Sequence, residues 1–217
     1  MDTDTTNVMN CDPIAGAYRW LEYMAFGSTL QRRRCEFLDA IGHARTALVV
    51  GDGDGRFLAE LHRRYPDLEV DSIDLSAGML AIARRRVGSS HVRFVQADAR
   101  MIAFPRDEYD LVVMHFFLDC FSEADAAGII TRTSTVTASG ARWIISEFRM
   151  PAGGWKALHA RLWLKTMYFF FRLTTGLSTN RLPRYRETLC ACGFTLEREV
   201  TERLGLVASE CWIKDTK

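Results

Sequence analysis

Residues 47–66, "ALVVGDGDGRFLAELHRRYP", place a short apolar run before a glycine-rich loop and a helical pattern after it. The run at 46–50 predicts a buried strand, and residues 55–65 predict an amphipathic helix. Gly51, Gly53 and Gly55 alternate with aspartates in the loop between them. Because glycine has no Cβ, such a loop can turn tightly and let a ligand approach its backbone. The stretch therefore predicts a strand, a ligand-binding turn and a helix.

The same alternation of strand and helix continues along the chain. Strands are predicted at 46–50, 68–74, 92–98, 109–117 and 141–148, with helices at 55–65, 77–87 and 123–136. Strands separated by helices of this length indicate parallel βαβ units. A helix at 184–194 and two strands at 195–202 and 205–215, joined by a short turn, predict an antiparallel pair at the end. We expect a doubly wound α/β fold with a mostly parallel seven-stranded sheet.

The acidic glycine loop does not fit the common phosphate-binding motifs. A dinucleotide fingerprint needs a third glycine at position 56, which is Arg56, and a Walker loop needs a lysine that is absent here. Asp52 and Asp54 would repel a pyrophosphate but suit a ligand with a cationic group. Asp54 has an equally ordinary alternative role as the cap of the following helix.

Two more aspartates follow strands whose carboxyl ends should lie beside this loop. Asp74 ends the second predicted strand and can accept hydrogen bonds from both hydroxyls of a ribose. Asp98 ends the third and can accept from the amino group of an adenine, although a turn residue is an equally common role there. Asp71, partway along the second strand, is expected to be a solvated edge residue.

Four segments together resemble the class I S-adenosylmethionine-dependent methyltransferases of the small-molecule type. They are "LVVGDGDG" at 48–55, "IDLSAGML" at 73–80, "QADA" at 96–99 and "YDLVVMHFFLDCF" at 109–121, in the order and at the spacing of that family. The resemblance covers about residues 46–150, and the terminal strand pair is also similar. It implies that S-adenosyl-L-methionine is the cofactor.

The resemblance also assigns residues to parts of that cofactor. It implies that Gly51, Gly53 and Gly55, with Asp52 in the same loop, pass beside the methionine part. It implies that Asp74 holds the ribose, and that the adenine is bound by Leu75, Met79, Asp98 and Ala99. One position departs from the family, which usually has a carboxylate two residues before the first glycine. That residue is Val49 here. Either Asp52 or Asp54 replaces the missing carboxylate, or the affinity for the cofactor is reduced.

The segment after the fourth strand carries the candidates for catalysis. His115 has a side chain suited to a general base at neutral pH, and Asp119 lies four residues further along. The alternatives are that His115 only packs against the cofactor and that Asp119 caps the helix beginning near Ser122. Phe116, Phe117 and Phe121 predict a partly aromatic substrate pocket, with Phe116 and Phe117 on opposite faces of the strand.

The segments on either side of this core are expected to complete the site. Residues 1–43 predict an N-terminal helical cap, and 44–217 a methyltransferase domain in which 151–183 form a helical lid insertion. The apolar face at 155–173 leaves three interpretations: a substrate lid, an amphipathic helix in peripheral contact with a membrane, or packing against the sheet. Tyr18 is a candidate to approach the cofactor's carboxylate, as tyrosines do in quinone-forming members.

Composition limits the remaining possibilities. The 217 residues carry a formal net charge of +1, and no basic stripe with interleaved aromatics predicts nucleic-acid binding. The "RRR" runs at 32–34 and 84–86 are expected to be solvated helix faces. The polar first residues do not resemble a signal peptide, and six dispersed cysteines suit a reducing cytoplasm. No metal is predicted, because the "CAC" at 190–192 has no second ligand pair at a matching spacing.

The sequence therefore favours methyl transfer to a small apolar or aromatic molecule. The alternatives are a lipid or quinone-precursor methyltransferase acting at a membrane surface, and a subunit that binds S-adenosylmethionine without catalysis. The atom that accepts the methyl group is not encoded in any of these motifs.

Overall fold

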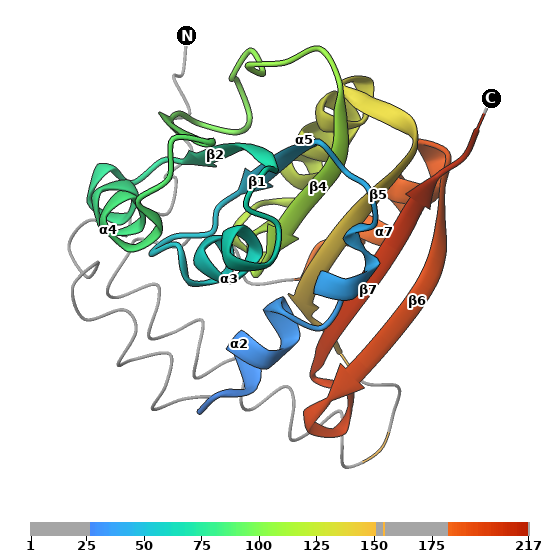
Figure 1. The fold of residues 1–217 in the computed structure, drawn as a ribbon. Coiled ribbons are helices and arrows are strands. Elements are labelled where there is room, and N and C mark those ends of the chain that lie inside the picture. The colour runs from blue at the N-terminus through green and yellow to red at the C-terminus, as the bar shows by residue number, and fades with distance from the viewer. Residues whose placement is uncertain (1–26, 151–153, 155–181, 217) are drawn as a thin grey trace, which may run out of the picture.

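The computed structural model describes residues 27–150, 154 and 182–216. Seven strands form one sheet in the order β3-β2-β1-β4-β5-β7-β6 (Figure 1). They are β1 (Thr46–Val50), β2 (Glu69–Asp74), β3 (Val92–Gln96), β4 (Tyr109–His115), β5 (Thr137–Phe148), β6 (Phe194–Glu202) and β7 (Val207–Lys214). The first five are parallel to one another, and β7 runs antiparallel to both of its neighbours. This confirms the predicted fold, including the antiparallel C-terminal pair.

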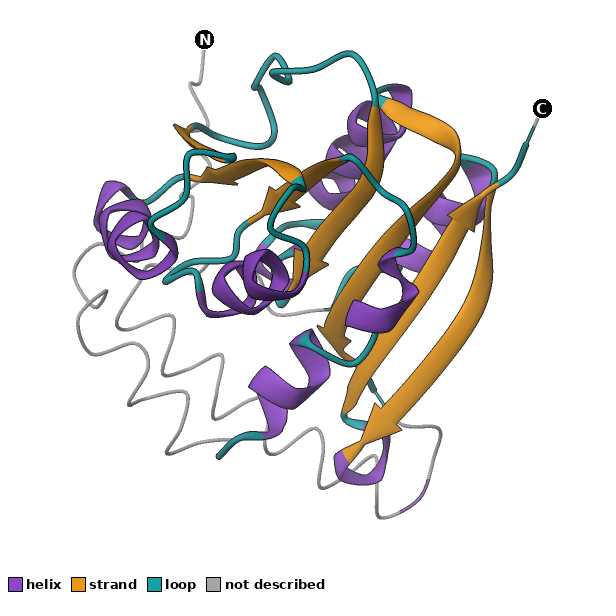
Figure 2. Ribbon diagram, viewed as in Figure 1, coloured by secondary structure: helices purple, strands orange, loops and turns teal. Residues whose placement is uncertain are grey.

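Helices cover both faces of the sheet (Figure 2). They are α2 (Thr29–Arg34), α3 (Arg56–Arg64), α4 (Ala77–Val87), α5 (Glu123–Thr135) and α7 (Tyr185–Ala191), with the short 3-10 turns η2 (Leu38–Ile41), η3 (Leu118–Cys120) and η4 (Arg203–Gly205). Apolar residues of α3 and η2 pack on one face, and those of α5 and α7 pack on the other. A three-layer α/β arrangement results.

Local signals explain where two of the helices begin. The hydroxyl of Ser76 accepts the N–H of Met79 at 3.0 Å and caps α4, and the hydroxyl of Ser122 accepts the N–H of Asp125 at 3.1 Å and caps α5. Helix α3 is different, because Asp52 and not Asp54 caps its first turn. The carboxylate of Asp52 accepts the N–H of Leu58 at 3.1 Å. Asp54 instead pairs with Arg56 and Arg86.

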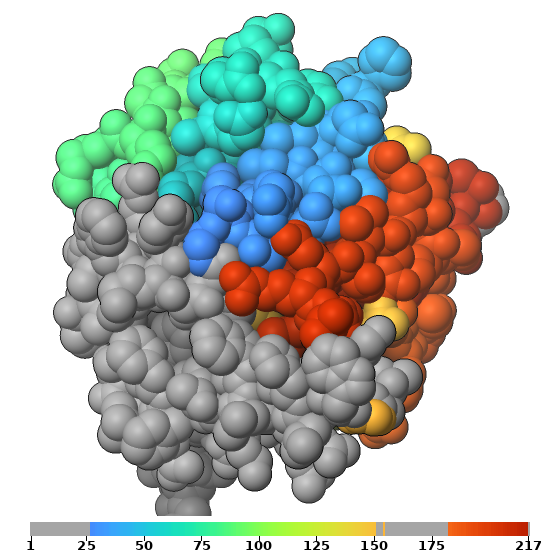
Figure 3. All heavy atoms as spheres, turned by 90° about the horizontal axis from the view of Figure 1, so that it is seen from below, coloured from blue at the N-terminus to red at the C-terminus, as the bar shows by residue number. Residues whose placement is uncertain are grey.

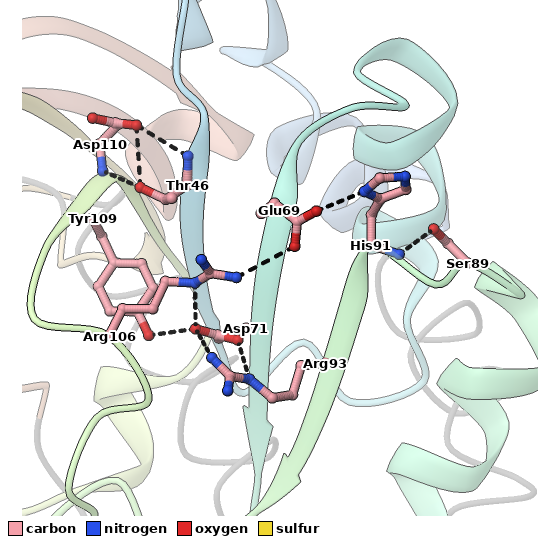
Figure 4. Close-up of polar contacts among 9 residues, drawn as sticks. All are labelled: Thr46, Glu69, Asp71, Ser89, His91, Arg93, Arg106, Tyr109 and Asp110. Atoms are coloured by element: carbon pink, nitrogen blue, oxygen red, sulfur yellow. Dashed lines mark hydrogen bonds and ion pairs between the residues drawn. The ribbon is translucent and has the colours of Figure 1, made fainter.

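Asp71 corrects one expectation, since it is a fully buried residue and not a solvated one. Its carboxylate accepts hydrogen bonds from Arg93, from Arg106 and, at 2.6 Å, from the hydroxyl of Tyr109 (Figure 4). Burial alone would raise the pKa of Asp71, but these donors outweigh it and the pKa lies below its ordinary value. These hydrogen bonds tie β2 to β3, to β4 and to the loop before β4.

The arginines at 32–34 are a second correction. Arg33 and Arg34 are only 8% and 6% exposed, whereas a solvated helix face was expected. The carbonyl oxygen of Arg33 accepts the hydroxyls of Ser146 in β5, at 3.0 Å, and Ser209 in β7, at 2.8 Å. Figure 3 shows this first described segment, in blue, between the cyan residues of the α3 region and the red C-terminal strands. Helix α2 is therefore docked on the sheet.

Candidate active site

The carboxyl ends of β1, β2, β3 and β4 meet at one edge of the sheet, as its parallel register requires. Strand order reverses between β1 and β4, which is where open α/β sheets bind their ligands. The glycine loop follows β1 at this point, with Asp74 beside it on β2 and His115 on β4. The three main sequence signals are thus brought to one place.

The glycine loop needs its glycines for conformation and for space. Gly51, Gly53 and Gly55 have φ values of 71°, 63° and 77°, in the left-handed region that other residues rarely adopt. A Cβ on Gly51 would lie 2.2 Å from the ring of Phe117, and a Cβ on Gly55 would lie 2.7 Å from that of Ala83. The first contact brings the segment after β4 onto the loop, and the second lets α3 approach α4.

Asp74 holds this loop in place. One carboxylate oxygen accepts the N–H of Gly53 at 3.1 Å and the other accepts the N–H of Ser76 at 2.8 Å. Each oxygen can accept a further bond, so the residue can still bind the two hydroxyls of a ribose. Leu75 is partly buried, and the buried Met79 places its sulfur 3.8 Å from the Cβ position of Gly53. This arrangement suits the predicted ribose and adenine contacts.

Asp98 lies in the turn after β3, where its carboxylate forms an ion pair with Arg100 at 2.7 Å. That bond is the main reason why the pKa of Asp98 lies below its ordinary value. Its backbone carbonyl accepts the N–H groups of Met101 and Ile102, and Ala99 is buried next to it. Asp98 therefore stabilises the turn through its backbone carbonyl and places a charged carboxylate at the edge of the site.

Asp52 has one carboxylate oxygen to which no described residue donates a hydrogen bond. Its Oδ2 accepts the N–H of Leu58, but its Oδ1 is shielded from solvent and has no hydrogen-bond partner among the described residues. Burial raises the pKa of Asp52 to about 7, against the opposing charge of Arg34. Because buried polar groups are normally satisfied, this oxygen indicates a place for a ligand that donates a hydrogen bond.

His115 is buried at the end of β4, with 4% of its surface exposed. Its ring lies edge-on to Phe57, with centroids 4.6 Å apart, and neither nitrogen has a hydrogen-bond partner among the described residues. Burial, and then the charge of Arg34, hold the pKa of His115 well below its usual range. The imidazole is thus neutral at pH 7, which a general base requires, and the lowered pKa also makes it a weak base.

Asp119 does not orient His115, since it makes no hydrogen bond to the ring. It lies in η3, where burial raises its pKa to about 6, and Ser122, not Asp119, caps α5. Its charge acts instead on Glu147, at the end of β5, whose pKa is raised well above its usual range by burial and by Asp119. Sequence reasoning missed Glu147, which accepts the N–H groups of Phe117 at 3.0 Å and Leu118 at 2.7 Å.

The aromatic residues after β4 separate as predicted. Phe116 packs against Phe148 with centroids 5.2 Å apart, while Phe117 packs against Phe121 at 4.9 Å and over Gly51. Phe116 is a non-glycine residue at a positive φ of 51°, and this turn ends β4 at His115, two residues earlier than expected. All three rings are partly buried, and Phe117 and Phe121 are the pair that lies beside the glycine loop.

Several predicted features fall elsewhere. Tyr18 and residues 155–173 lie outside the described residues, as does most of the predicted lid at 151–183. Among the residues that are described, no three His, Cys, Asp or Glu side chains are grouped to hold a metal. In the same part of the chain, no helix is long and apolar enough to cross a membrane.

The loop and its surroundings fit S-adenosylmethionine on structural grounds. The loop has a glycine backbone that a ligand can approach and a carboxylate oxygen, on Asp52, that no described residue pairs and that could bind an ammonium group. Asp74 on β2 adds a carboxylate for a ribose. No phosphate-binding lysine is present in this loop. The residues thus suit a cationic nucleoside better than a nucleotide.

Comparisons with known proteins agree with this geometry. A family model described as a methyltransferase domain matches residues 47–140. The chain is 31% identical over 166 residues to a demethylmenaquinone methyltransferase of Thermus thermophilus, covering 75% of this chain and 73% of that protein. It is 29% identical over 154 residues to a ubiquinone/menaquinone biosynthesis C-methyltransferase of Pseudomonas putida, covering 69% of this chain but 58% of that protein.

A solved structure shows the same fold. The S-adenosylmethionine-dependent methyltransferase SibL superposes with a TM-score of 0.70 at 20% identity. The match covers 92% of this chain and 58% of that one, so this chain spans somewhat more than half of the length of its structural relative.

Proposed function

The chain belongs to the class I S-adenosylmethionine-dependent methyltransferases, and we propose that it methylates a small apolar or aromatic molecule. An apolar or aromatic substrate is supported by the position of Phe117 and Phe121 beside the glycine loop. A methyl acceptor that stacks on these rings would lie next to the methionine part of the cofactor. Gly51, Gly53, Gly55, Asp52, Asp74, Leu75, Met79, Asp98 and Ala99 are the proposed cofactor-binding residues.

The chemistry follows from what the site offers. The bound cofactor supplies a methyl group on a cationic sulfur, which is transferred by in-line displacement, so the protein mainly aligns the acceptor and excludes water. The partly buried aromatic segment at 116–121 is suited to exclude water. If the accepting atom carries a proton, the neutral His115 can take it up as the acceptor's lone pair forms the new bond to the methyl carbon.

A quinone precursor is the second candidate substrate. It is favoured by the names of two relatives, the Thermus demethylmenaquinone methyltransferase and the Pseudomonas ubiquinone/menaquinone biosynthesis C-methyltransferase. Such a ring is flat and apolar, and it would suit the same phenylalanines. The predicted contact of residues 155–173 with a membrane belongs to this candidate, and it stays a prediction together with the cytoplasmic location and the lid.

Isotope labelling tests the main proposal. The protein is incubated with a metabolite extract and S-adenosylmethionine labelled in its methyl group, and products are identified by mass spectrometry. We expect one labelled small molecule and an equal amount of S-adenosylhomocysteine, and no label with an Asp74→Ala control. A demethylmenaquinol analogue added separately tests the second candidate, and flotation with liposomes tests the membrane contact. Absence of any labelled product would contradict methyl transfer.

Thermal unfolding tests cofactor choice independently of the acceptor. A ligand at 100 times its Kd adds about 2.7 kcal/mol to the free energy of unfolding. S-adenosylmethionine and S-adenosylhomocysteine should therefore raise the melting temperature, and NAD should not. A shift with NAD alone would refute the cofactor assignment.

A further inference from the structure

The end of β1 supplies no charge to the site. Val49 is buried in the apolar core beneath α3, two residues before Gly51. The cofactor carries an amino-acid moiety with an ammonium and a carboxylate, and both must leave water to bind near this loop. Charged groups from elsewhere in the chain have to replace their hydration, because burying an unpaired charge is costly.

Only one of the two loop aspartates has capacity left for an ammonium. Asp54 is neutralised by two arginines, with Arg56 at 3.0 Å and Arg86 at 2.9 Å. Asp52 has no such ion pair among the described residues, and its Oδ1 lacks a hydrogen-bond partner there. Asp52 is therefore the carboxylate that can compensate for Val49.

A buried arginine faces the same place from the N-terminal segment. Arg34 ends α2, with its guanidinium carbon 5.1 Å from the centroid of the Phe116 ring. Its charge acts on Asp52 in the glycine loop and on His115 at the end of β4. The hydroxyls of Ser146 and Ser209 fix the preceding residue to β5 and β7, so the position of Arg34 is set by the sheet.

We propose that Asp52 and Arg34 bind the two ends of the cofactor's amino-acid moiety, Asp52 the ammonium and Arg34 the carboxylate. A planar guanidinium can donate two parallel hydrogen bonds to a carboxylate, which a neutral side chain cannot reproduce. In this arrangement each charged end of the moiety faces a protein group of the opposite charge. The inference rests on the assignment of S-adenosylmethionine as cofactor, and it makes α2 a part of the cofactor site.

Calorimetry with three ligands tests both ends of the moiety. S-adenosylhomocysteine has both charges, decarboxylated S-adenosylmethionine lacks the carboxylate, and 5′-methylthioadenosine lacks the whole amino-acid moiety. Arg34→Gln should raise the Kd of S-adenosylhomocysteine roughly 10- to 100-fold, the loss of a charge-assisted hydrogen bond. It should leave the Kd values of the other two ligands unchanged. Asp52→Asn should weaken both ligands that carry an amino group and leave 5′-methylthioadenosine unchanged.

Matched variants separate this proposal from general damage. Arg32→Gln, on the same helix with its side chain 58% exposed, should leave all three Kd values unchanged. Unchanged binding of 5′-methylthioadenosine shows that Arg34→Gln is folded, and Arg34→Lys should bind S-adenosylhomocysteine with an intermediate Kd. Equal weakening of all three ligands by Arg34→Gln, or no weakening, would overturn the proposal. Wild-type protein that binds none of the three would overturn the cofactor assignment itself.

Discussion

His115 combines burial with two ring nitrogens that have no hydrogen-bond partner among the described residues. A buried histidine that only filled space would lose the hydrogen bonds that water supplies in the unfolded chain, so a buried ring without these bonds suits a chemical role. His115→Gln should lower kcat by about 10²- to 10⁴-fold, as expected for loss of a general base, without changing the Kd of S-adenosylhomocysteine. His91→Gln, at an exposed histidine, is the matched control. A His115→Gln enzyme at full rate would rule out the proposed base.

Asp52 should make cofactor binding depend on pH near neutrality. Burial raises its pKa to about 7, and only its ionised form can pair with an ammonium group. The affinity for S-adenosylhomocysteine should therefore increase from pH 6 to pH 8, by up to roughly tenfold per pH unit below the pKa. Calorimetry at several pH values measures this, and Asp52→Asn should give a nearly flat profile. An unchanged slope in Asp52→Asn would assign the titration to another group.

The same pKa has the opposite consequence for the free protein. A carboxyl group whose pKa is higher in the folded state adds stability below its ordinary pKa near 3.8, and loses it as the pH rises through about 7. Asp52 therefore favours binding and opposes folding in its charged form. A bound ammonium would offset that cost.

At the scale of elements, the contact between α3 and α4 depends on Gly55. A Cβ there would lie 2.7 Å from that of Ala83, and φ is 77°. Gly55→Ala should reduce the free energy of unfolding by about 2–5 kcal/mol, through overpacking together with backbone strain. Gly88→Ala, at a φ of 61° with nothing within 4 Å, should cost only the strain, about 1–2 kcal/mol. Denaturant unfolding compares the two variants, and equal losses would show that the added Cβ at position 55 causes no overpacking against Ala83.

The turn between β4 and α5 depends on Glu147. This residue accepts two backbone N–H groups just after Phe116, whose φ is positive. Glu147→Ala leaves both amides unpaired and should cost roughly 1–3 kcal/mol of stability for each. It should also speed hydrogen exchange at 116–121 and weaken binding of S-adenosylhomocysteine, because Phe117 would leave the glycine loop.

Glu147→Gln is the conservative control for that experiment. Its amide oxygen can accept the same two hydrogen bonds, so exchange and binding should stay close to wild type. If Glu147→Gln were as damaging as Glu147→Ala, the carboxyl proton or charge would be the important feature and not the acceptor oxygen.

At the scale of the whole molecule, the Asp71 group ties the sheet together without serving the site. Asp71→Ala leaves the buried hydroxyl of Tyr109 without its acceptor and should cost about 1–3 kcal/mol of unfolding free energy. The pKa of Asp71 is lowered in the fold, so this contribution should be present at neutral pH and be lost as acid protonates the carboxylate. The Kd of S-adenosylhomocysteine should not change. Weaker cofactor binding at unchanged stability would give Asp71 a functional role instead.

The order of strands and helices was predictable because the signals for it are local. Helix α4 has its predicted bounds, since Ser76 caps it and Gly88 ends it. Strand β5 begins at Thr137, four residues before the predicted start, because Thr137 pairs with Tyr109 on a neighbouring strand. A shift of register separates that pair from the next one, Leu111 with Arg142, and no pattern within 137–141 predicts it.

The sequence by itself determined the doubly wound fold, the glycine loop and the position of Asp74, because periodicity and turn residues act over a few neighbouring residues. Only the tertiary structure decided that Arg33 and Arg34 are buried, that Asp71 is an internal acceptor and that Glu147 holds the turn after β4. Each of these depends on groups far apart in the chain, such as Glu147 and Phe117, which are 30 residues apart. The sequence does not distinguish a charged residue that is exposed to solvent from one that is buried in an ion pair, because the fold determines which partner lies beside it.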